Sequence, residues 1–241
     1  MKRSLLVLAA ATLAACSSNA NSLEGDPFVR VFHAIRPSVV LITMKIPSDD
    51  PKRRGEFDDA YGTGLIVASG AWGSQILTVE HVIHGARDLH VTIGEKRRVP
   101  ANVSARDAKS DLALVETSAA DLPVVALGTS KNLEPGTPIG VAGYPIPDAF
   151  ADEGLGMATS VYAGRISSIR KDALELDLPV IPGESGGPVF DVEDGTIVAL
   201  AESRFDEEKA IGFGIPIDDA RRFLHGKLHD SGTAPAASTT R

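Results

Sequence analysis

A single hydroxyl, that of Ser185, lies inside the glycine-rich segment Pro-Gly-Glu-Ser-Gly-Gly-Pro at residues 182–188. Glycine has no Cβ, so a loop with Gly183, Gly186 and Gly187 can turn sharply and direct several backbone N–H groups inward. A hydroxyl beside such donors supplies what acyl transfer requires, a nucleophile and an oxyanion hole. We expect the N–H groups of Gly183 and Ser185 to be these donors. The alternative is a glycine-rich surface turn, which is the better interpretation if the chain supplies no base.

A candidate base and a candidate acid precede the serine in the chain. The apolar segment 76–79 runs toward His81, and Asp111 opens the apolar segment 112–115. The order His, Asp, Ser is one of the known orders of a Ser-His-Asp triad. In such a triad His81 takes the proton of Ser185, while Asp111 fixes the imidazole tautomer and stabilises the imidazolium.

These three segments resemble the trypsin-like serine proteases, and more narrowly the bacterial HtrA/DegP type. The matching motifs are Leu77-Thr78-x-x-His81, Asp111-Leu112-Ala113-Leu114, Gly183-x-Ser185-Gly186-Gly187-Pro188, Gly62-Thr63-Gly64-Leu65-Ile66-Val67 and Gly212-Phe213-Gly214-Ile215-Pro216. The resemblance runs from about residue 28 to residue 224. It implies a double β-barrel and serine endopeptidase activity on protein or peptide substrates.

Twelve short segments rich in Val, Ile, Leu and Thr, separated by turn residues, predict an all-β fold. They are residues 38–46, 62–68, 75–79, 89–93, 97–104, 112–117, 138–142, 160–169, 173–177, 187–191, 196–202 and 211–215. Six strands followed by six more predict two closed antiparallel β-barrels, the chymotrypsin-like fold that the resemblance implies. His81 and Asp111 then belong to the first barrel and Ser185 to the second, so we expect the site in the crevice between them.

The domain prediction places a signal peptide at 1–15, a polar tether at 16–25 and the protease domain at 26–225. Its barrels span about 26–120 and 121–225, and a disordered tail follows at 226–241. A short terminal helix is expected from Asp218 as N-cap, with Ala220, Phe223 and Leu224 at helical spacing. Many HtrA-type proteases carry a PDZ domain after the protease, and we expect none here.

The N-terminus has the pattern of a bacterial lipoprotein signal. Lys2 and Arg3 precede an uncharged apolar run over 5–15, too short to span a membrane in the mature protein. The segment up to Cys16 resembles a lipobox, which implies cleavage before Cys16 and lipid attachment to its thiol. The alternative is an ordinary signal with an unrelated cysteine. Ser17, rather than Asp, implies the periplasmic face of the outer membrane.

Composition excludes several classes of partner. Cleavage would remove two basic residues and no acidic one, leaving 22 basic against 32 acidic residues and a net charge of −10. Such a charge disfavours nucleic acid. A lone cysteine excludes an internal disulfide, and the sequence has no HExxH, Cys/His or nucleotide-loop motif, so we expect no metal and no cofactor.

The resemblance also bears on oligomeric state. The family often forms trimers through aromatic residues, and Phe28 and Phe32 either serve that purpose or pack in the core.

The resemblance also predicts a substrate pocket. In trypsin-like enzymes the residue six before the serine lines the pocket base, which here is Pro179, next to Val180. Ala201 and Glu202 align with the pocket wall. Because the base has no carboxylate, we expect cleavage after small or medium apolar residues. The carboxylate of Glu184 is expected to point outward.

Three functional hypotheses follow. The first is an active, lipid-anchored serine endopeptidase acting on unfolded or envelope proteins. The second is a non-proteolytic binding or chaperone module on a protease fold, which the complete triad argues against. The third is a purely structural envelope lipoprotein. His84 is interpreted as a surface or packing histidine.

Overall fold

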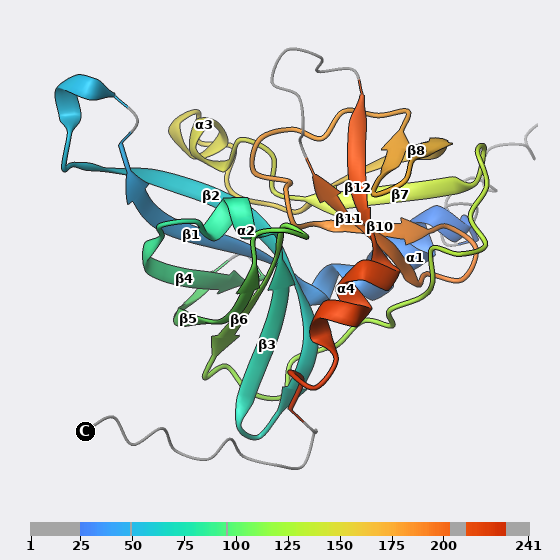
Figure 1. The fold of residues 1–241 in the computed structure, drawn as a ribbon, viewed down its shortest axis with the longest axis horizontal. Coiled ribbons are helices and arrows are strands. Elements are labelled where there is room, and N and C mark those ends of the chain that lie inside the picture. Colours follow the sequence, from blue (N-terminus) through green and yellow to red (C-terminus); the bar gives the residue numbers. More distant parts are fainter. Residues whose placement is uncertain (1–24, 49, 95, 203–210, 230–241) are drawn as a thin grey trace, which may run out of the picture.

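The computed structural model of the chain describes residues 25–48, 50–94, 96–202 and 211–229. The strands of these residues form two closed barrels of six strands each, joined by antiparallel pairs. Figure 1 shows the first barrel in blue to green and the second in yellow-green to red. The predicted fold class is therefore confirmed.

The first barrel has the strand order β1-β2-β3-β6-β5-β4. Its strands are β1 (Val39–Pro47), β2 (Phe57–Gly70), β3 (Gly73–Thr78), β4 (Arg87–Ile93), β5 (Arg97–Asp107) and β6 (Leu112–Thr117). The second barrel has the order β10-β11-β12-β9-β8-β7. Its strands are β7 (Pro138–Gly143), β8 (Ser160–Ile169), β9 (Leu174–Leu176), β10 (Pro188–Asp191), β11 (Ile197–Glu202) and β12 (Gly212–Pro216).

Short helices join and flank the barrels. They are α1 (Pro27–Ile35), α2 (Glu80–Ile83), α3 (Pro147–Asp152) and α4 (Ile217–Leu224), with 3-10 turns at Arg36–Ser38 and Pro51–Arg53. Helix α1 begins at a capping aspartate, because Asp26 accepts a hydrogen bond from Phe28 N and Pro27 occupies the first turn. Among the described residues, no helix is long and apolar enough to cross a membrane.

Aliphatic side chains fill each barrel. Leu65, Ile76 and Leu114 are fully buried in the first, and Ile139 and Val189 in the second. Every residue of β3 is buried, as expected for a strand covered on both faces. Strand β3 can therefore hold the residues that follow it in a fixed position.

Phe190 of β10 links the second barrel to the N-terminal helix. Its ring is fully buried, and its centroid lies 5.7 Å from that of Phe28. Phe28 and Phe32 are partly buried against the core, so the described contacts of Phe28 and Phe32 are those of packing residues.

The predicted terminal helix is present as α4, but Asp218 is not its N-cap. Helix α4 begins one residue earlier, at Ile217, directly after β12, and its N-cap Pro216 has no capping side chain. The Asp218 carboxylate instead accepts hydrogen bonds from Thr129 Oγ1, Ser130 N and Ser130 Oγ. Thr129 and Ser130 lie in the loop before β7, and their three donors bind the Asp218 carboxylate.

Helix α4 packs between the barrels rather than on one of them. It contacts β11 and β12 of the second barrel and β6 of the first, and its apolar face is buried. After α4 the chain passes beside β3, where the Gln75 side chain donates to Lys227 O and accepts from His229 N.

Some predicted segments lie outside the described residues. They are residues 1–24, which include the expected signal, Cys16 and most of the tether, and residues 230–241 of the expected tail.

Candidate active site

His81 and Asp111 lie at the same edge of the first barrel. Strands β3 and β6 pair antiparallel with Thr78 opposite Ala113, so the residues after β3 meet those before β6. Asp111 adopts a left-handed backbone conformation, with φ +51°. Aspartate is one of the few residues besides glycine that tolerates this conformation readily.

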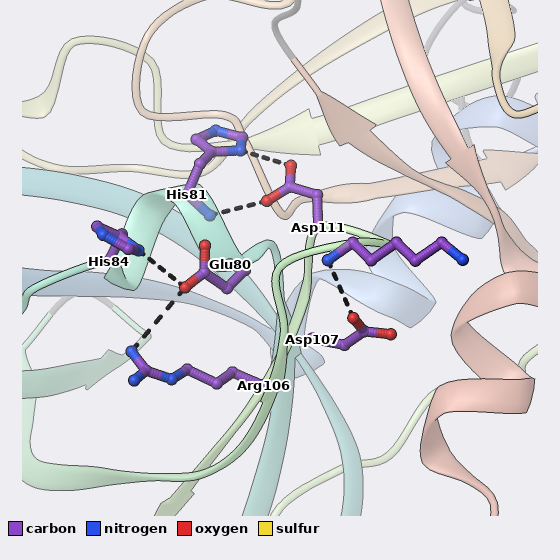
Figure 2. Close-up of polar contacts among 7 residues, drawn as sticks. Glu80, His81, His84, Arg106, Asp107 and Asp111 are labelled. Carbon is purple, nitrogen blue, oxygen red and sulfur yellow. Dashed lines mark hydrogen bonds and ion pairs between the residues drawn. The ribbon is translucent and has the colours of Figure 1, made fainter.

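The Asp111 carboxylate holds His81 at two points. Its Oδ1 accepts from the His81 backbone N–H at 2.8 Å, and its Oδ2 pairs with the ring Nδ1 at 2.6 Å. Figure 2 shows both contacts. Two contacts fix the backbone and the ring together, so the opposite ring nitrogen, Nε2, is turned away from Asp111.

The environment of His81 raises the pKa of its imidazole. Burial lowers that pKa, but the hydrogen bond and the charge of Asp111 raise it, with further contributions from the carboxylates of Glu202 and Glu80. The net direction is upward because the imidazolium is stabilised by these negative charges. This is the electrostatic arrangement that a histidine base needs when it takes up a proton.

The loop that carries Ser185 depends on two glycines with positive φ. Gly183 has φ +97° and Gly186 has φ +86°. A Cβ at Gly183 would lie 2.3 Å from Tyr144 O, and a Cβ at Gly186 would lie 2.3 Å from Thr63 O. No side chain fits at either position, which explains the glycine-rich composition of the loop.

This loop docks on the first barrel. Ser185 O accepts a hydrogen bond from Thr63 N of β2 at 2.9 Å, and Gly186 lies against the hydroxyl of Thr78 at the end of β3. Ser185 is buried, with 6% of its surface exposed. The structure thus places the serine loop beside the strand that leads to His81. Ser185 Oγ makes no hydrogen bond with the His81 ring within the described part of the chain.

The backbone N–H groups of Gly183 and Ser185 are the candidate donors of the serine loop. Within the described residues, neither Gly183 N nor Ser185 N donates a hydrogen bond. The Pro182 carbonyl accepts from Ile146 N at 2.7 Å. Because C=O and N–H point in opposite directions across a trans peptide, Gly183 N–H points away from Ile146. These are the two groups that the sequence predicts as oxyanion donors.

Glu184 corrects the prediction that its carboxylate points outward. The residue is fully buried, and its Oε2 accepts from Ile181 N at 2.8 Å. Its Oε1 has no hydrogen-bond partner among the described residues. Burial raises the pKa of this carboxyl to about 7, and the Ile181 bond only partly opposes the rise. The prediction failed because the inward turn is set by packing beneath Gly143 of β7, which no local pattern encodes.

The predicted pocket residues gather around β12. A Cβ on Gly212 would lie 2.9 Å from the Val180 side chain, and Ala201 and Glu202 of β11 pair with β12. Val180, Ala201 and Glu202 are buried, and Glu202 is near enough to influence His81. Pro179 is exposed at the surface.

A second acidic residue beside His81 was not predicted. Glu80 is buried, and its Oε1 pairs with His84 Nδ1 at 3.0 Å and lies 4.0 Å from Arg106. Figure 2 shows this group next to the His81–Asp111 pair. The available signal was a charged residue between the apolar segment 76–79 and His81. Across the described residues, no cluster of His, Cys, Asp or Glu could hold a metal ion.

Comparison with protein families matches residues 62–200 to the trypsin-like peptidase domain. A probable periplasmic serine endoprotease, DegP-like, of Hahella chejuensis is 32% identical over 196 residues, covering 76% of this chain and 39% of that protein. The putative serine protease HhoB of Synechocystis is 29% identical over 199 residues, covering 76% and 44%. The chain therefore spans about two fifths of the length of these relatives.

Solved structures show the same fold. The HtrA-type protease AlgW with a tripeptide has a TM-score of 0.68 at 23% identity, covering 82% of this chain and 62% of that one. The serine endoprotease from Yersinia pestis has a TM-score of 0.65 at 25% identity, covering 82% and 65%. Both support the double-barrel architecture.

The buried carboxyl of Glu184 predicts a pH-dependent stability. Its pKa is about 7 in the fold against 4.5 for a free carboxyl. Between these values the folded state holds the proton that the unfolded state has lost, so rising pH lowers the free energy of unfolding, by at most about 3 kcal/mol. Glu184→Gln removes this titration. Urea unfolding at pH 5 and pH 8 should show that the variant gains stability relative to wild type as pH rises.

Glu153→Gln is the matched control for this measurement, because Glu153 is exposed. Its stability relative to wild type should not change between the two pH values. An equally constant difference for Glu184→Gln would show that Glu184 does not titrate near neutral pH in the folded protein.

Proposed function

Because the chain belongs to the family of trypsin-like peptidases, we propose that it is a serine endopeptidase that cleaves peptide bonds by Ser-His-Asp acyl transfer. Its HtrA- and DegP-like relatives support this proposal. The observation that carries it is the two-point contact of Asp111 with His81, at the edge of the barrel on which the Ser185 loop docks.

The proposed mechanism uses the nitrogen of His81 that faces away from Asp111. With Nδ1–H donated to Asp111, the neutral Nε2 accepts the Ser185 proton while Oγ attacks the scissile carbonyl carbon. The imidazolium then donates that proton to the leaving amine, and a covalent acyl-enzyme forms. Water, activated by the same nitrogen, releases the acid and restores the serine. Asp111 stabilises the imidazolium in both halves of the reaction.

The N–H groups of Gly183 and Ser185 serve as the oxyanion hole in this mechanism. Their lack of partners among the described residues supports this role. A tetrahedral intermediate carries negative charge on the former carbonyl oxygen, and fixed N–H donors stabilise that charge most strongly where water is excluded. Each donor contributes about 3–4 kcal/mol to lowering the barrier.

The proposed substrates are unfolded or envelope proteins, cut after small or medium apolar residues. Val180 and Ala201 are apolar and buried near β12, while Glu202 is the one acidic residue of the predicted pocket set. Apolar side chains are exposed when a protein unfolds, so such a preference matches unfolded clients. We also propose that Cys16 is lipidated and holds the enzyme at the periplasmic face of the outer membrane.

Replacement of the nucleophile is the first test. Ser185→Ala should lower kcat on an unfolded protein substrate by about 10⁶-fold, and a fluorophosphonate should label wild type at Ser185 only. Ser167→Ala, on the exposed surface of β8, is the matched control and should keep both properties. Wild-type protein that is folded and is not labelled, with or without substrate, contradicts the proposal. Undiminished suppression of aggregation by Ser185→Ala would then favour the chaperone alternative.

Cleavage preference is the second test. In a peptide library that varies the residue before the cut, kcat/KM should be higher for Val, Ala or Leu than for Arg or Lys by about 10-fold or more. The reason is the apolar character of Val180 and Ala201, the buried residues that are predicted to form the pocket. A dominant Arg or Lys preference would instead assign Glu202 as the residue that pairs with the substrate.

Membrane attachment is the third test. Wild type expressed in a Gram-negative host should partition into the detergent phase, because covalent acyl chains bind membranes through their buried methylene groups. Cys16→Ser should partition into the aqueous phase, and Ser17→Ala should behave as wild type. Detergent-phase Cys16→Ser would show that the attachment does not depend on this thiol.

A further inference from the structure

Thr63 makes four polar contacts at the seam between the barrels. This fully buried residue of β2 donates from Oγ1 to Gly183 O at 2.7 Å and accepts at the same atom from Tyr144 N at 3.1 Å. Its backbone N–H donates to Ser185 O at 2.9 Å, and its carbonyl accepts from Thr78 Oγ1 at 2.8 Å. One residue of the first barrel therefore contacts the serine loop at two places.

The Thr63 hydroxyl has a fixed orientation. A hydroxyl has one proton to donate, and here it is directed to Gly183 O while a lone pair faces Tyr144 N. Both of those partners belong to the second barrel. Removing the hydroxyl takes away the hydrogen-bond acceptor of Tyr144 N and the donor to Gly183 O. Losing these two hydrogen bonds at the seam destabilises the observed arrangement of the loop.

The contact with Gly183 O holds one of the two peptides that adjoin Gly183. Gly183 lies between the Pro182–Gly183 peptide, whose carbonyl bonds Ile146 N, and the Gly183–Glu184 peptide, whose carbonyl bonds Thr63. Glycine allows a wider range of φ and ψ than other residues do, so the chain alone does not fix these peptides. With both neighbouring carbonyls held, the direction of the Gly183 N–H is held as well.

We propose that Thr63 is a positioning residue, whose hydroxyl holds the Gly183 carbonyl and so fixes the backbone torsions at Gly183, with the Gly183 N–H directed into the oxyanion hole. This inference rests on the proposed function and adds a residue that does not touch the substrate. Because an N–H donor stabilises an oxyanion only at the correct distance and angle, loss of the hydroxyl weakens binding of the transition state more than binding of the substrate.

The test compares three variants. Thr63→Val has nearly the same shape without a hydroxyl, and Thr63→Ser keeps the hydroxyl without the methyl group. Thr117→Val is the matched control, because it removes another buried threonine hydroxyl of the first barrel, bonded to Pro100 O at 2.9 Å. The readouts are kcat and KM on a peptide substrate, the inhibition constant of a peptide aldehyde, and peptide affinity in a Ser185→Ala background. Thermal melting identifies the folded variants.

We expect Thr63→Val to lower kcat and to weaken aldehyde inhibition in parallel, by about 10- to 100-fold, while KM and peptide affinity change by about twofold or less. Thr63→Ser should restore kcat to within about threefold of wild type, and Thr117→Val should keep the wild-type kcat. This pattern separates positioning from stability, because Thr63→Val and Thr117→Val each lose one buried hydroxyl.

Three results would overturn the inference. They are a Thr63→Val kcat equal to that of Thr117→Val, a loss that appears only in KM, and a Thr63→Ser variant as slow as Thr63→Val. If Thr63→Val does not fold, Thr63→Ala, which keeps the backbone N–H to Ser185 O, takes its place with the same readouts. Fluorophosphonate labelling distinguishes the failures: labelled wild type with unimpaired Thr63→Val rejects only the positioning role, whereas unlabelled wild type rejects the proposed function as well.

Discussion

The docking of the 181–187 loop against β2 and β3 is the contact on which the candidate site depends. The histidine and aspartate belong to one barrel and the serine to the other, so their relative placement depends on how the barrels meet. Hydrogen bonds from Thr63 to the serine loop, and the close approach of Gly186 to Thr78, hold this seam. Helix α4 packs on both barrels and adds apolar burial at the same junction.

This docking has an energetic cost at Glu184. Burying a carboxyl with one hydrogen bond favours its neutral form, so the loop beside the nucleophile contains a group that titrates near neutral pH. The acidic groups around His81 act in the opposite direction, because they stabilise its protonated form. The site thus combines one carboxyl whose pKa is raised by burial with other carboxylates that raise the pKa of a histidine.

Much of the architecture could be predicted from the sequence. Alternating and continuous apolar segments predicted the strands of both barrels. A strand buried on one face alternates apolar and polar residues, and a strand buried on both faces is apolar throughout. Helix α1 was missed although Asp26-Pro27 is a recognisable start signal. The Asp218 cap was wrong because helix α4 begins at Ile217 and a loop distant in sequence binds the Asp218 carboxylate. The inward turn of Glu184 was missed because packing against Gly143, which is also distant in sequence, sets it.

The sequence by itself determined the residue types and the chain order of the candidate site, and it placed glycine at the two loop positions where φ is positive. It did so because motif spacing and the range of φ that a residue tolerates are local properties. Only the tertiary structure decided that Asp111 holds His81 at two atoms, that Glu184 is buried and that the Thr63 hydroxyl bonds Gly183 O. These contacts join residues from different strands or barrels, and no local pattern of residues specifies which of them meet when the barrels close and pack together.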